Sequence, residues 1–525
     1  MEPPTPADES ASGDRQIRVV AKRRRSTTMT DARNAVRQVL GVSWHVESLV
    51  RAGRQVLMRT VGTHAVGTDA HARASHEDAL AMSDTHLFTK VEADVPIRGY
   101  AENLDAVADL SRLSKGSGTP LYWVHETLRW QQALDLMPEA VRGGFGISIG
   151  QPDTGYTIHP NLGTAGLDLE HDWDVISNDD DAFDDLQQNL LWPLPFPGHG
   201  TSTASVVVGH GDPTVGIVGL TPAARLVPFR ATESVVQVFD SDVARAVARA
   251  RDVGCHVVTM SLGGKGFFGL EEEIQRAVDQ GMIVMAAAGN YVRFVTAPAS
   301  YANCLAVAAT GPDDTMWSGS SRGRAVDVSM PGAEVPAARW TDDRLPFVGP
   351  SNGTSFSVAH LAAAAALWLA LHGPATLITA YGGSGVQAAF LAVLRWPGVC
   401  AVPADWDTDW GVGRVDLPSL LAAPLPSSDD IRAIAAFQLP TDAAVGRISA
   451  ALSADPVVVR KRLAALLRAE DTQVFAELLD RHEGELVYLA YADPSFADAV
   501  AAIDGMPSGA FRLDGVSRLL AARLS

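Results

Sequence analysis

Three polar side chains in this sequence have the types and surroundings that a nucleophilic reaction needs. Ser355 follows Gly353-Thr354 at the start of a long helical run, where the positive end of the helix dipole suits a developing anion. His199 stands between two glycines, which leave its imidazole accessible as a general base. Asp153 ends an apolar run and could orient that imidazole. Taken alone, each pattern also fits a helix cap or a turn, so the combination must decide.

The chain order Asp153, His199, Ser355 is one of the three orders found in convergent Asp-His-Ser sites. Further motifs surround these residues, at 153–155 with 159–162, 198–201, 219–224, 260–264, 286–290, 297–301, 326–332 and 411–416. In sequence and order they resemble the motifs of the subtilase family, and the resemblance covers residues 143–420. It implies a subtilisin-like serine endopeptidase that acts through an acyl-enzyme intermediate.

The resemblance also implies a role for each matching residue. Asp153, His199 and Ser355 would form the catalytic triad, while Asn290 and the backbone N–H of Ser355 would stabilise the oxyanion. Two further segments would hold the substrate backbone and the side chain before the scissile bond, namely Ser261, Leu262 and Gly263 with Ala287, Ala288 and Gly289. These segments contain no carboxylate, so we expect a medium or large uncharged side chain there.

One position departs from the family pattern. The family usually has Pro four residues after the nucleophile, where this sequence has Ala359, followed by His360. Alanine is an excellent helix former, so we expect the turn that carries Ser355 to be retained. We assign His360 to packing rather than to a second base.

From Phe145 onward, apolar runs alternate with amphipathic helical patterns. The runs predict strands at 145–150, 225–230, 256–261, 282–287, 304–309 and 326–330, with helices between them such as 241–253 and 270–280. This alternation predicts an α/β fold, a subtilisin-like parallel sheet with helices on both faces. Active sites in such sheets lie beyond the carboxyl ends of the strands.

Four regions are expected along the chain. Residues 1–40, with the basic cluster Lys22 to Arg25, predict a disordered arm, and residues 41–140 predict a small α+β module. The catalytic domain would span 141–422, followed by a linker at 423–428. Residues 429–525 are helical by period and predict a helical domain, which serves either as a protein-partner domain or as a stabilising cap.

The N-terminal module has two interpretations. Residues 87–126 are weakly similar to the inhibitory propeptide of the family, with strands expected at 87–91 and 121–126 and a helix at 105–113. Residues 41–142 would then occupy the active site as in a zymogen, with self-cleavage between Glu126 and Arg142. The alternative is an unrelated sensing module of a regulated protease.

Three function classes share the residues named so far. A peptide hydrolase is the default, a peptide ligase or cyclase would use the same triad, and an inactive peptide-binding scaffold is disfavoured by the intact Asp, His, Ser and Asn set. Ligase and hydrolase differ in how well water is excluded, which the sequence does not show.

Composition limits the partners and the compartment. The chain has 525 residues and a net charge of −19, which repels phosphate backbones, so protein or peptide substrates are expected rather than nucleic acid. The N-terminus lacks the apolar run of a secretory signal, and the apolar run at 361–371 is too short to span a bilayer, so we expect a cytoplasmic protein without membrane contact.

Neither a disulfide framework nor a metal-bound cofactor is expected. The three cysteines, Cys255, Cys304 and Cys400, have no metal-ligand spacing. The acidic stretch 179–185 could hold calcium, but it lacks the spacing of a known loop and fits a solvated loop better.

Overall fold

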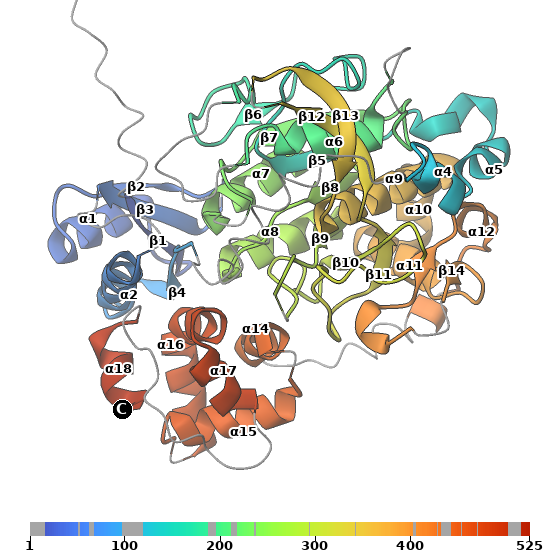
Figure 1. Ribbon diagram of the computed structural model, residues 1–525. Coiled ribbons are helices and arrows are strands. Elements are labelled where there is room, and N and C mark those ends of the chain that lie inside the picture. Colours follow the sequence, from blue (N-terminus) through green and yellow to red (C-terminus); the bar gives the residue numbers. More distant parts are fainter. Residues whose placement is uncertain are drawn as a thin grey trace, which may run out of the picture.

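The structure, a computed structural model, consists of a large central domain (119–423), an N-terminal module (16–96) and a C-terminal helical domain (443–524) (Figure 1). It describes residues 16–50, 53–61, 68–96, 119–186, 196–211, 218–235, 238–292, 294–341, 343–402, 406–427, 429–431, 443–452, 454–469, 471–501 and 516–524.

A nine-stranded sheet in the order β14-β15-β11-β10-β9-β8-β5-β7-β6 forms the middle of the central domain, and its paired strands are parallel except for the edge pair β14-β15. The strands are β5 (Ser148–Asp153), β6 (Trp173–Asp174), β7 (Arg225–Arg230), β8 (Val257–Met260), β9 (Ile283–Ala287), β10 (Leu305–Thr310), β11 (Val328–Pro331), β14 (Cys400–Ala401) and β15 (Arg414–Val415). The six strands predicted from apolar runs are confirmed. The two-residue strands are too short to give a periodic signal.

Alternating side chains of this sheet enter two separate cores. Val257, Ile283 and Met285 pack with the first core, around α6 (His199–Val208) and α9 (Thr354–His372). Val258 and Val284 pack with the second, around α7 (Asp240–Asp252) and α8 (Phe268–Asp279). The predicted parallel sheet with helices on both faces is thus present.

Further elements complete the central domain: the antiparallel hairpin β12 (Val335–Trp340) and β13 (Pro346–Ser351), α10 (Pro374–Tyr381), α11 (Gly383–Leu394), the 3₁₀ turn η4 (Thr408–Trp410) and α12 (Leu417–Ala422). Helix α9 is longer than its apolar run suggested. Among the described residues it is long and apolar enough to cross a membrane, as is the bent pair α10 and α11 if counted as one span, but 94% of the α9 window is buried within the protein.

Ordered structure begins earlier than predicted. The N-terminal module contains β1 (Gln16–Arg23), α1 (Met29–Val39), β2 (His45–Ser48), β3 (Gln55–Val61), α2 (Asp69–Ser83) and β4 (Phe88–Ala93), with the strands in the antiparallel order β2-β3-β1-β4. The prediction of a disordered arm over 1–40 is therefore wrong for residues 16–40. The cationic side chains of this segment have partners: Arg18 binds Asp242 at 2.6 Å, and Lys22 binds Glu272, both on helices of the central domain.

The boundary predicted at residue 140 is also wrong. The predicted strand at 121–126 lies instead in helix α4 (Trp123–Thr127), which is followed by α5 (Trp130–Asp135) and the 3₁₀ segment η3 (Glu139–Gly144). Trp123, Val124 and Leu128 are buried in the first core, so this stretch belongs to the central domain. Cleavage between Glu126 and Arg142 would cut through this packed structure, which argues against the predicted processing site. The helix predicted at 105–113 lies outside the described residues.

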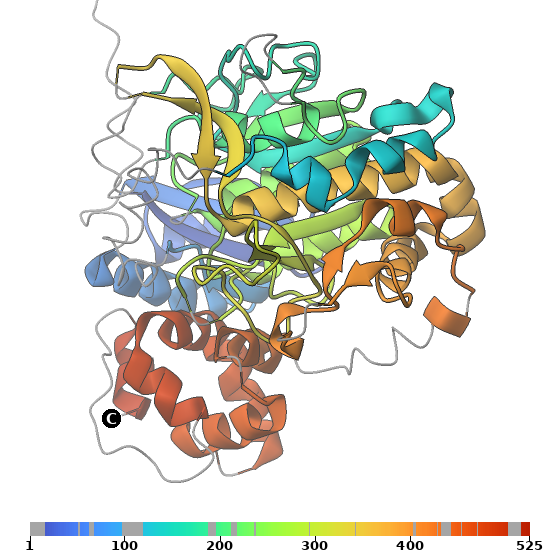
Figure 2. The same cartoon turned by 45° about the vertical axis from the view of Figure 1, so that its right-hand side comes forward.

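The C-terminal helical domain comprises α14 (Ala443–Leu452), α15 (Pro456–Leu466), α16 (Thr472–Ala492), α17 (Pro494–Ala501) and α18 (Arg518–Leu524), as its helical period predicted. Two views show it lying beside α2 and β4 of the N-terminal module (Figures 1 and 2). Its apolar side chains share one core with those of the module, including Val36 and Met82 of the module and Phe475 and Leu486 of the domain.

Two carboxylates meet where the N-terminal module joins the central domain. Asp94 follows β4, Asp240 begins α7, and both are fully buried. Burial and the nearby charge of Asp94 raise the pKa of Asp240 to about 7, although Lys265 and a hydrogen bond from the backbone N–H of Gly266 act in the opposite direction. The contribution of Asp240 to the free energy of unfolding is therefore fully present below pH 3.8, its ordinary pKa. That contribution is lost as the pH rises through about 7.

We expect Asp240→Asn to reduce this loss, since the amide keeps an acceptor for Gly266 and has no charge to desolvate. The melting temperature of the unmodified chain should fall more between about pH 5 and about pH 8 than that of the variant. Asp252→Asn, at the exposed end of the same helix, is the control and should follow the unmodified chain. Equal pH slopes for all three proteins would contradict the assignment to Asp240.

Candidate active site

The predicted site residues meet at one edge of the central sheet. Asp153 is the last residue of β5, while the segments 261–263 and 287–290 leave β8 and β9 at their carboxyl ends. His199 and Ser355 lie at the N-terminal ends of α6 and α9. Parallel strands bring their carboxyl ends to a common edge, which explains how residues separated by up to 202 positions become neighbours.

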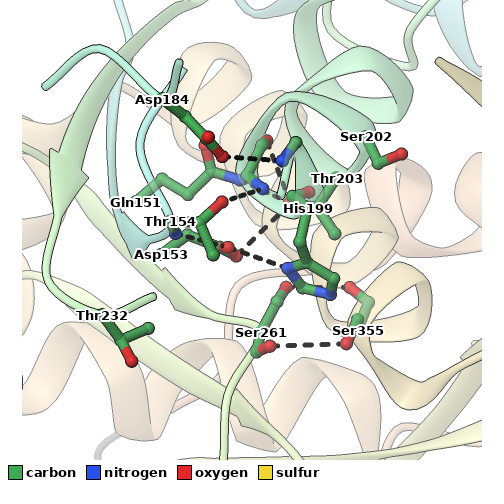
Figure 3. A network of polar contacts seen from close by, with 12 residues as sticks. Gln151, Asp153, Thr154, Asp184, His199, Ser202, Thr203, Thr232, Ser261 and Ser355 are labelled. Atoms are coloured by element: carbon green, nitrogen blue, oxygen red, sulfur yellow. Dashed lines mark hydrogen bonds and ion pairs between the residues drawn. The ribbon is translucent and has the colours of Figure 1, made fainter. Parts of the chain in front are cut away.

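A hydrogen bond joins Asp153 and His199. Oδ1 of Asp153 lies 2.8 Å from Nδ1 of His199, and the same oxygen accepts the backbone N–H of Thr154 at 2.7 Å. The hydroxyl of Thr203 lies 3.5 Å from Oδ2. Because Asp153 is completely buried, these polar partners satisfy a carboxylate that water does not reach. The bond fixes the imidazole with its Nε2 directed away from Asp153, toward Ser355 (Figure 3).

The backbone on either side of His199 is held by two hydrogen bonds to side-chain oxygens. Thr154 Oγ1 accepts the backbone N–H of Gly200 at 3.0 Å, and Asp184 Oδ2 accepts that of Gly198 at 2.6 Å. Gly198 has φ of +76°, and a Cβ there would lie 2.4 Å from the ring of Trp340, so glycine is required for both conformation and space. Burial raises the pKa of Asp184, whereas its backbone hydrogen bonds lower it.

Ser355 is the second residue of α9 and is nearly buried. Its hydroxyl donates to the carbonyl of Ser261 at 3.4 Å, and the hydroxyl of Ser261 donates to the carbonyl of Ser355 at 3.0 Å. Among the hydrogen bonds between described residues, none joins Ser355 to His199, although the imidazole lies between Asp153 and Ser355 (Figure 3). Catalytic hydrogen bonds are often long until a substrate binds.

The amide of Asn290 has a defined orientation. Its Oδ1 accepts both the backbone N–H and the hydroxyl of Thr354, each at 2.9 Å. These two donors require an oxygen, so the nitrogen Nδ2 must point the other way. A Cβ on Gly353 would stand 3.4 Å from Nδ2, which places this donor beside the turn that carries Ser355.

Both segments predicted to hold the substrate are hydrogen-bonded to this turn, through Ser261 to Ser355 and through the N–H of Gly289 to the hydroxyl of Thr354 at 3.2 Å. Ser261, Leu262 and Ala287 are buried, and no carboxylate belongs to either segment. Sequence reasoning missed Thr296, whose hydroxyl is buried without a hydrogen-bond partner. A Cβ on Gly263 would come 2.6 Å from that hydroxyl, and one on Gly289 would come 2.8 Å from the Thr296 methyl group, so both glycines make room for it.

The alanine at position 359, where the family usually has proline, does not disturb the helix. Ala359 is fully buried inside α9, and the helix continues through it. His360 Nδ1 lies 2.9 Å from the carbonyl of Pro331, and burial lowers the pKa of His360 to about 4 despite that bond. The histidine is therefore neutral and occupied in packing, as its assignment predicted.

The acidic stretch is more than a solvated loop. Asp184 supports Gly198, and Asp174, just before the stretch, accepts the backbone N–H groups of Ile176 and Ser177 and binds Arg230. Within the described ranges, no three His, Cys, Asp or Glu side chains are placed to share a metal ion. The carboxylates at the inner side of the loop thus act as acceptors for backbone groups.

Comparisons with known proteins identify the family to which this chain is similar. The profile of the Subtilase family matches residues 144–381. Thermitase of Thermoactinomyces vulgaris is 32% identical over 227 residues, which are 43% of this chain and 75% of thermitase. The thermophilic serine proteinase of Bacillus sp. strain AK1 is 33% identical over 44% of this chain and 54% of its own length. A solved protease structure from Pseudoalteromonas arctica, 23% identical, covers 57% of this chain and 96% of its own, with a TM-score of 0.49.

This chain therefore belongs to the subtilase family of serine endopeptidases. The family match ends at residue 381, before the C-terminal helical domain begins.

Asp184 was not among the predicted site residues, and we expect it to position His199. Asp184→Ala should lower kcat by roughly 10–100-fold with little change in KM, because a small displacement of the imidazole is costly. Asp184→Asn keeps an oxygen acceptor for Gly198 and should recover most of the activity. The exposed neighbour variant Asp185→Ala should behave as the unmodified enzyme. A rise in KM at constant kcat would instead place Asp184 in substrate binding.

Proposed function

We propose that this chain hydrolyses peptide bonds with Ser355 as nucleophile, His199 as general base and Asp153 as the group that orients His199. The observation that carries the proposal is the buried 2.8 Å hydrogen bond between Asp153 and His199, with Ser355 on the other side of the imidazole (Figure 3). Family membership supports the same assignment.

In this mechanism, the Ser355 hydroxyl gives up its weak bond to Ser261 and attacks the scissile carbonyl carbon. His199 takes the proton at Nε2, and Asp153 stabilises the resulting imidazolium through Nδ1. The carbonyl oxygen becomes negative in the tetrahedral intermediate, where Nδ2 of Asn290 and the N–H of Ser355 would donate to it. His199 then protonates the leaving amine as the C–N bond breaks. In the second half, His199 takes a proton from a water that attacks the acyl carbonyl, and returns it to the Ser355 oxygen as the ester bond breaks.

The substrate class follows from the surrounding segments. An extended peptide would pair with the backbone at Ser261, Leu262 and Gly263 and place one side chain against Ala287, Ala288 and Gly289. Those surfaces bring no carboxylate, which favours an uncharged side chain before the scissile bond.

We further propose that the N-terminal module restrains the enzyme. Its sheet packs on α7 and α8 of the central domain: Val20 and Leu57 enter the second core with residues of these helices, and Gln55 donates to Glu272 of α8 at 2.8 Å. The strand β8, which leads to Ser261, belongs to the same core. The restraint would thus come from residues 16–96 and the chain that follows them, before α4.

Ser355→Ala should abolish peptide hydrolysis. The expected loss in turnover is roughly 10⁶-fold, the size of the loss when the nucleophilic serine of subtilisin is removed. The readout is the mass of the products from a mixed peptide library, which also reveals ligation. Ser357→Ala removes a hydroxyl from the same helix, one that donates to Met330, and should retain turnover within about tenfold. Turnover of Ser355→Ala near that of the control would exclude Ser355 as the nucleophile.

Asn290→Ala should lower turnover by roughly 10²–10³ with little change in KM, because its donor serves a charge that exists only in the transition state. The matched variant Thr354→Val removes the hydroxyl that binds Oδ1 of Asn290 but leaves Nδ2 in place. Its loss should be much smaller. If both variants lose turnover equally, Asn290 serves to hold the turn rather than the oxyanion.

A further inference from the structure

The C-terminal helical domain covers the edge of the N-terminal module. Strand β4 is an edge strand in the order β2-β3-β1-β4; α16 packs against it, and α14, packed on α16, reaches it through the side chain of Arg447. The C-terminal helical domain lies beside this edge in both views (Figures 1 and 2). A Cβ on Gly484, within α16, would stand 3.5 Å from Cγ of Glu92, so the helix backbone approaches β4 closely. Farther along, Tyr488 packs edge-on against His76 of α2 with ring centroids 5.5 Å apart.

A buried group of charges forms the centre of this contact. Arg447 of α14 donates to Glu92 of β4 at 2.9 Å and to Glu483 of α16 at 3.1 Å. Lys90 of β4 lies 3.5 Å from Glu92 and also binds Glu483. Arg447, Glu92 and Glu483 are each at most 4% exposed. We call these four residues the ion cluster.

The central domain completes the junction. Lys265 donates to the carbonyl of Ala93, the residue after Glu92, at 3.0 Å, and Lys90 lies 5.5 Å from the ring centroid of Phe268 at the start of α8. Tyr491 of α16 packs edge-on against Phe294 of the central domain, at 4.9 Å between centroids. The ion cluster is thus where all three parts of the protein meet.

Charges buried this way depend on one another. Burial alone would raise the pKa of Glu92, but Arg447, Lys90 and Lys265 together lower it to about 2. Removing one member of such a cluster leaves its partners buried without a counter-charge, which destabilises the contact far more than losing a surface pair. Since Glu92 comes from the module and Arg447 from the C-terminal helical domain, the penalty acts on their association.

We propose that the C-terminal helical domain is a clamp that holds the N-terminal module on the central domain through the ion cluster, so that the module stays bound after the connecting chain is cut. The inference deepens the restraint proposed above and rests on it for its effect on activity. It assigns the helical domain an intramolecular partner, the β4 edge of the module.

The test separates retention from catalysis. A recognition sequence for a site-specific protease is inserted between residues 108 and 109 of the full chain carrying Ser355→Ala, and the purified protein is cut there. Size-exclusion chromatography should show the N-terminal fragment still bound. With Arg447→Met added, the fragment should dissociate at least tenfold faster. Lys461→Met, which removes an exposed positive charge from α15 of the same domain, is the matched control and should retain the fragment.

Glu92→Gln provides a second variant, because it changes the module and leaves the helical domain intact. It should also speed dissociation at least tenfold, and circular dichroism before cutting checks that each variant is folded. The clamp would be overturned if folded Glu92→Gln and Arg447→Met retained the fragment as well as Lys461→Met does. Glu92→Gln alone decides if Arg447→Met does not fold.

A parallel assay with Ser355 intact reads the consequence for activity. Arg447→Met and Glu92→Gln should hydrolyse a peptide substrate faster than Lys461→Met. The increase should be about as large as the increase in the rate at which the N-terminal fragment dissociates. Release without any gain in rate would support the clamp and reject the restraint. A chain that hydrolyses nothing in any form would reject the proposed function, while the chromatography with Ser355→Ala would still decide the clamp.

Discussion

The arrangement of the site depends on the buried hydrogen bond between Asp153 and His199. A carboxylate at the end of β5 has no access to water, so its charge is tolerated only with the imidazole, the N–H of Thr154 and Thr203 around it. These partners come from two different elements that must be placed accurately against each other. The rigid sheet and the packed helix α9 provide that accuracy, because neither can shift without opening a core.

The same sheet explains why the two faces of the central domain have different uses. One face carries α6 and α9, which bring His199 and Ser355 to the site. The other carries α7 and α8, whose outer surface receives the N-terminal module through Val20 and Leu57. At this face Lys265, two residues beyond the predicted substrate segment, donates to the carbonyl of Ala93 of the module. The predicted catalytic residues and the N-terminal module are thus attached to opposite faces of one sheet.

The motifs predicted which residues the fold brings together. The glycines beside His199, the acidic residue at the end of β5 and the Asn that binds Thr354 were all identified from motifs, and the six buried strands from apolar runs. Sequence reasoning failed where the partners are far away in the chain. The cations Arg18 and Lys22 indicated a solvated arm because their partners, Asp242 and Glu272, lie more than 200 residues later. Asp184 was missed for a different reason: Gly198 lies only 14 residues later, but the acidic run around Asp184 indicated a solvated loop.

The edge strand β4 shows why the C-terminal helical domain and the N-terminal module are best understood together. Charged side chains on an edge strand ordinarily discourage pairing with other chains while remaining solvated. Here Glu92 is removed from water and Lys90 is partly shielded, and both are bound by residues more than 350 positions later. A buried charge of this kind adds little to stability compared with an apolar pair, but it tolerates few alternative partners. The ion cluster therefore favours one docked arrangement of the three parts, and that specificity is what an intramolecular restraint needs.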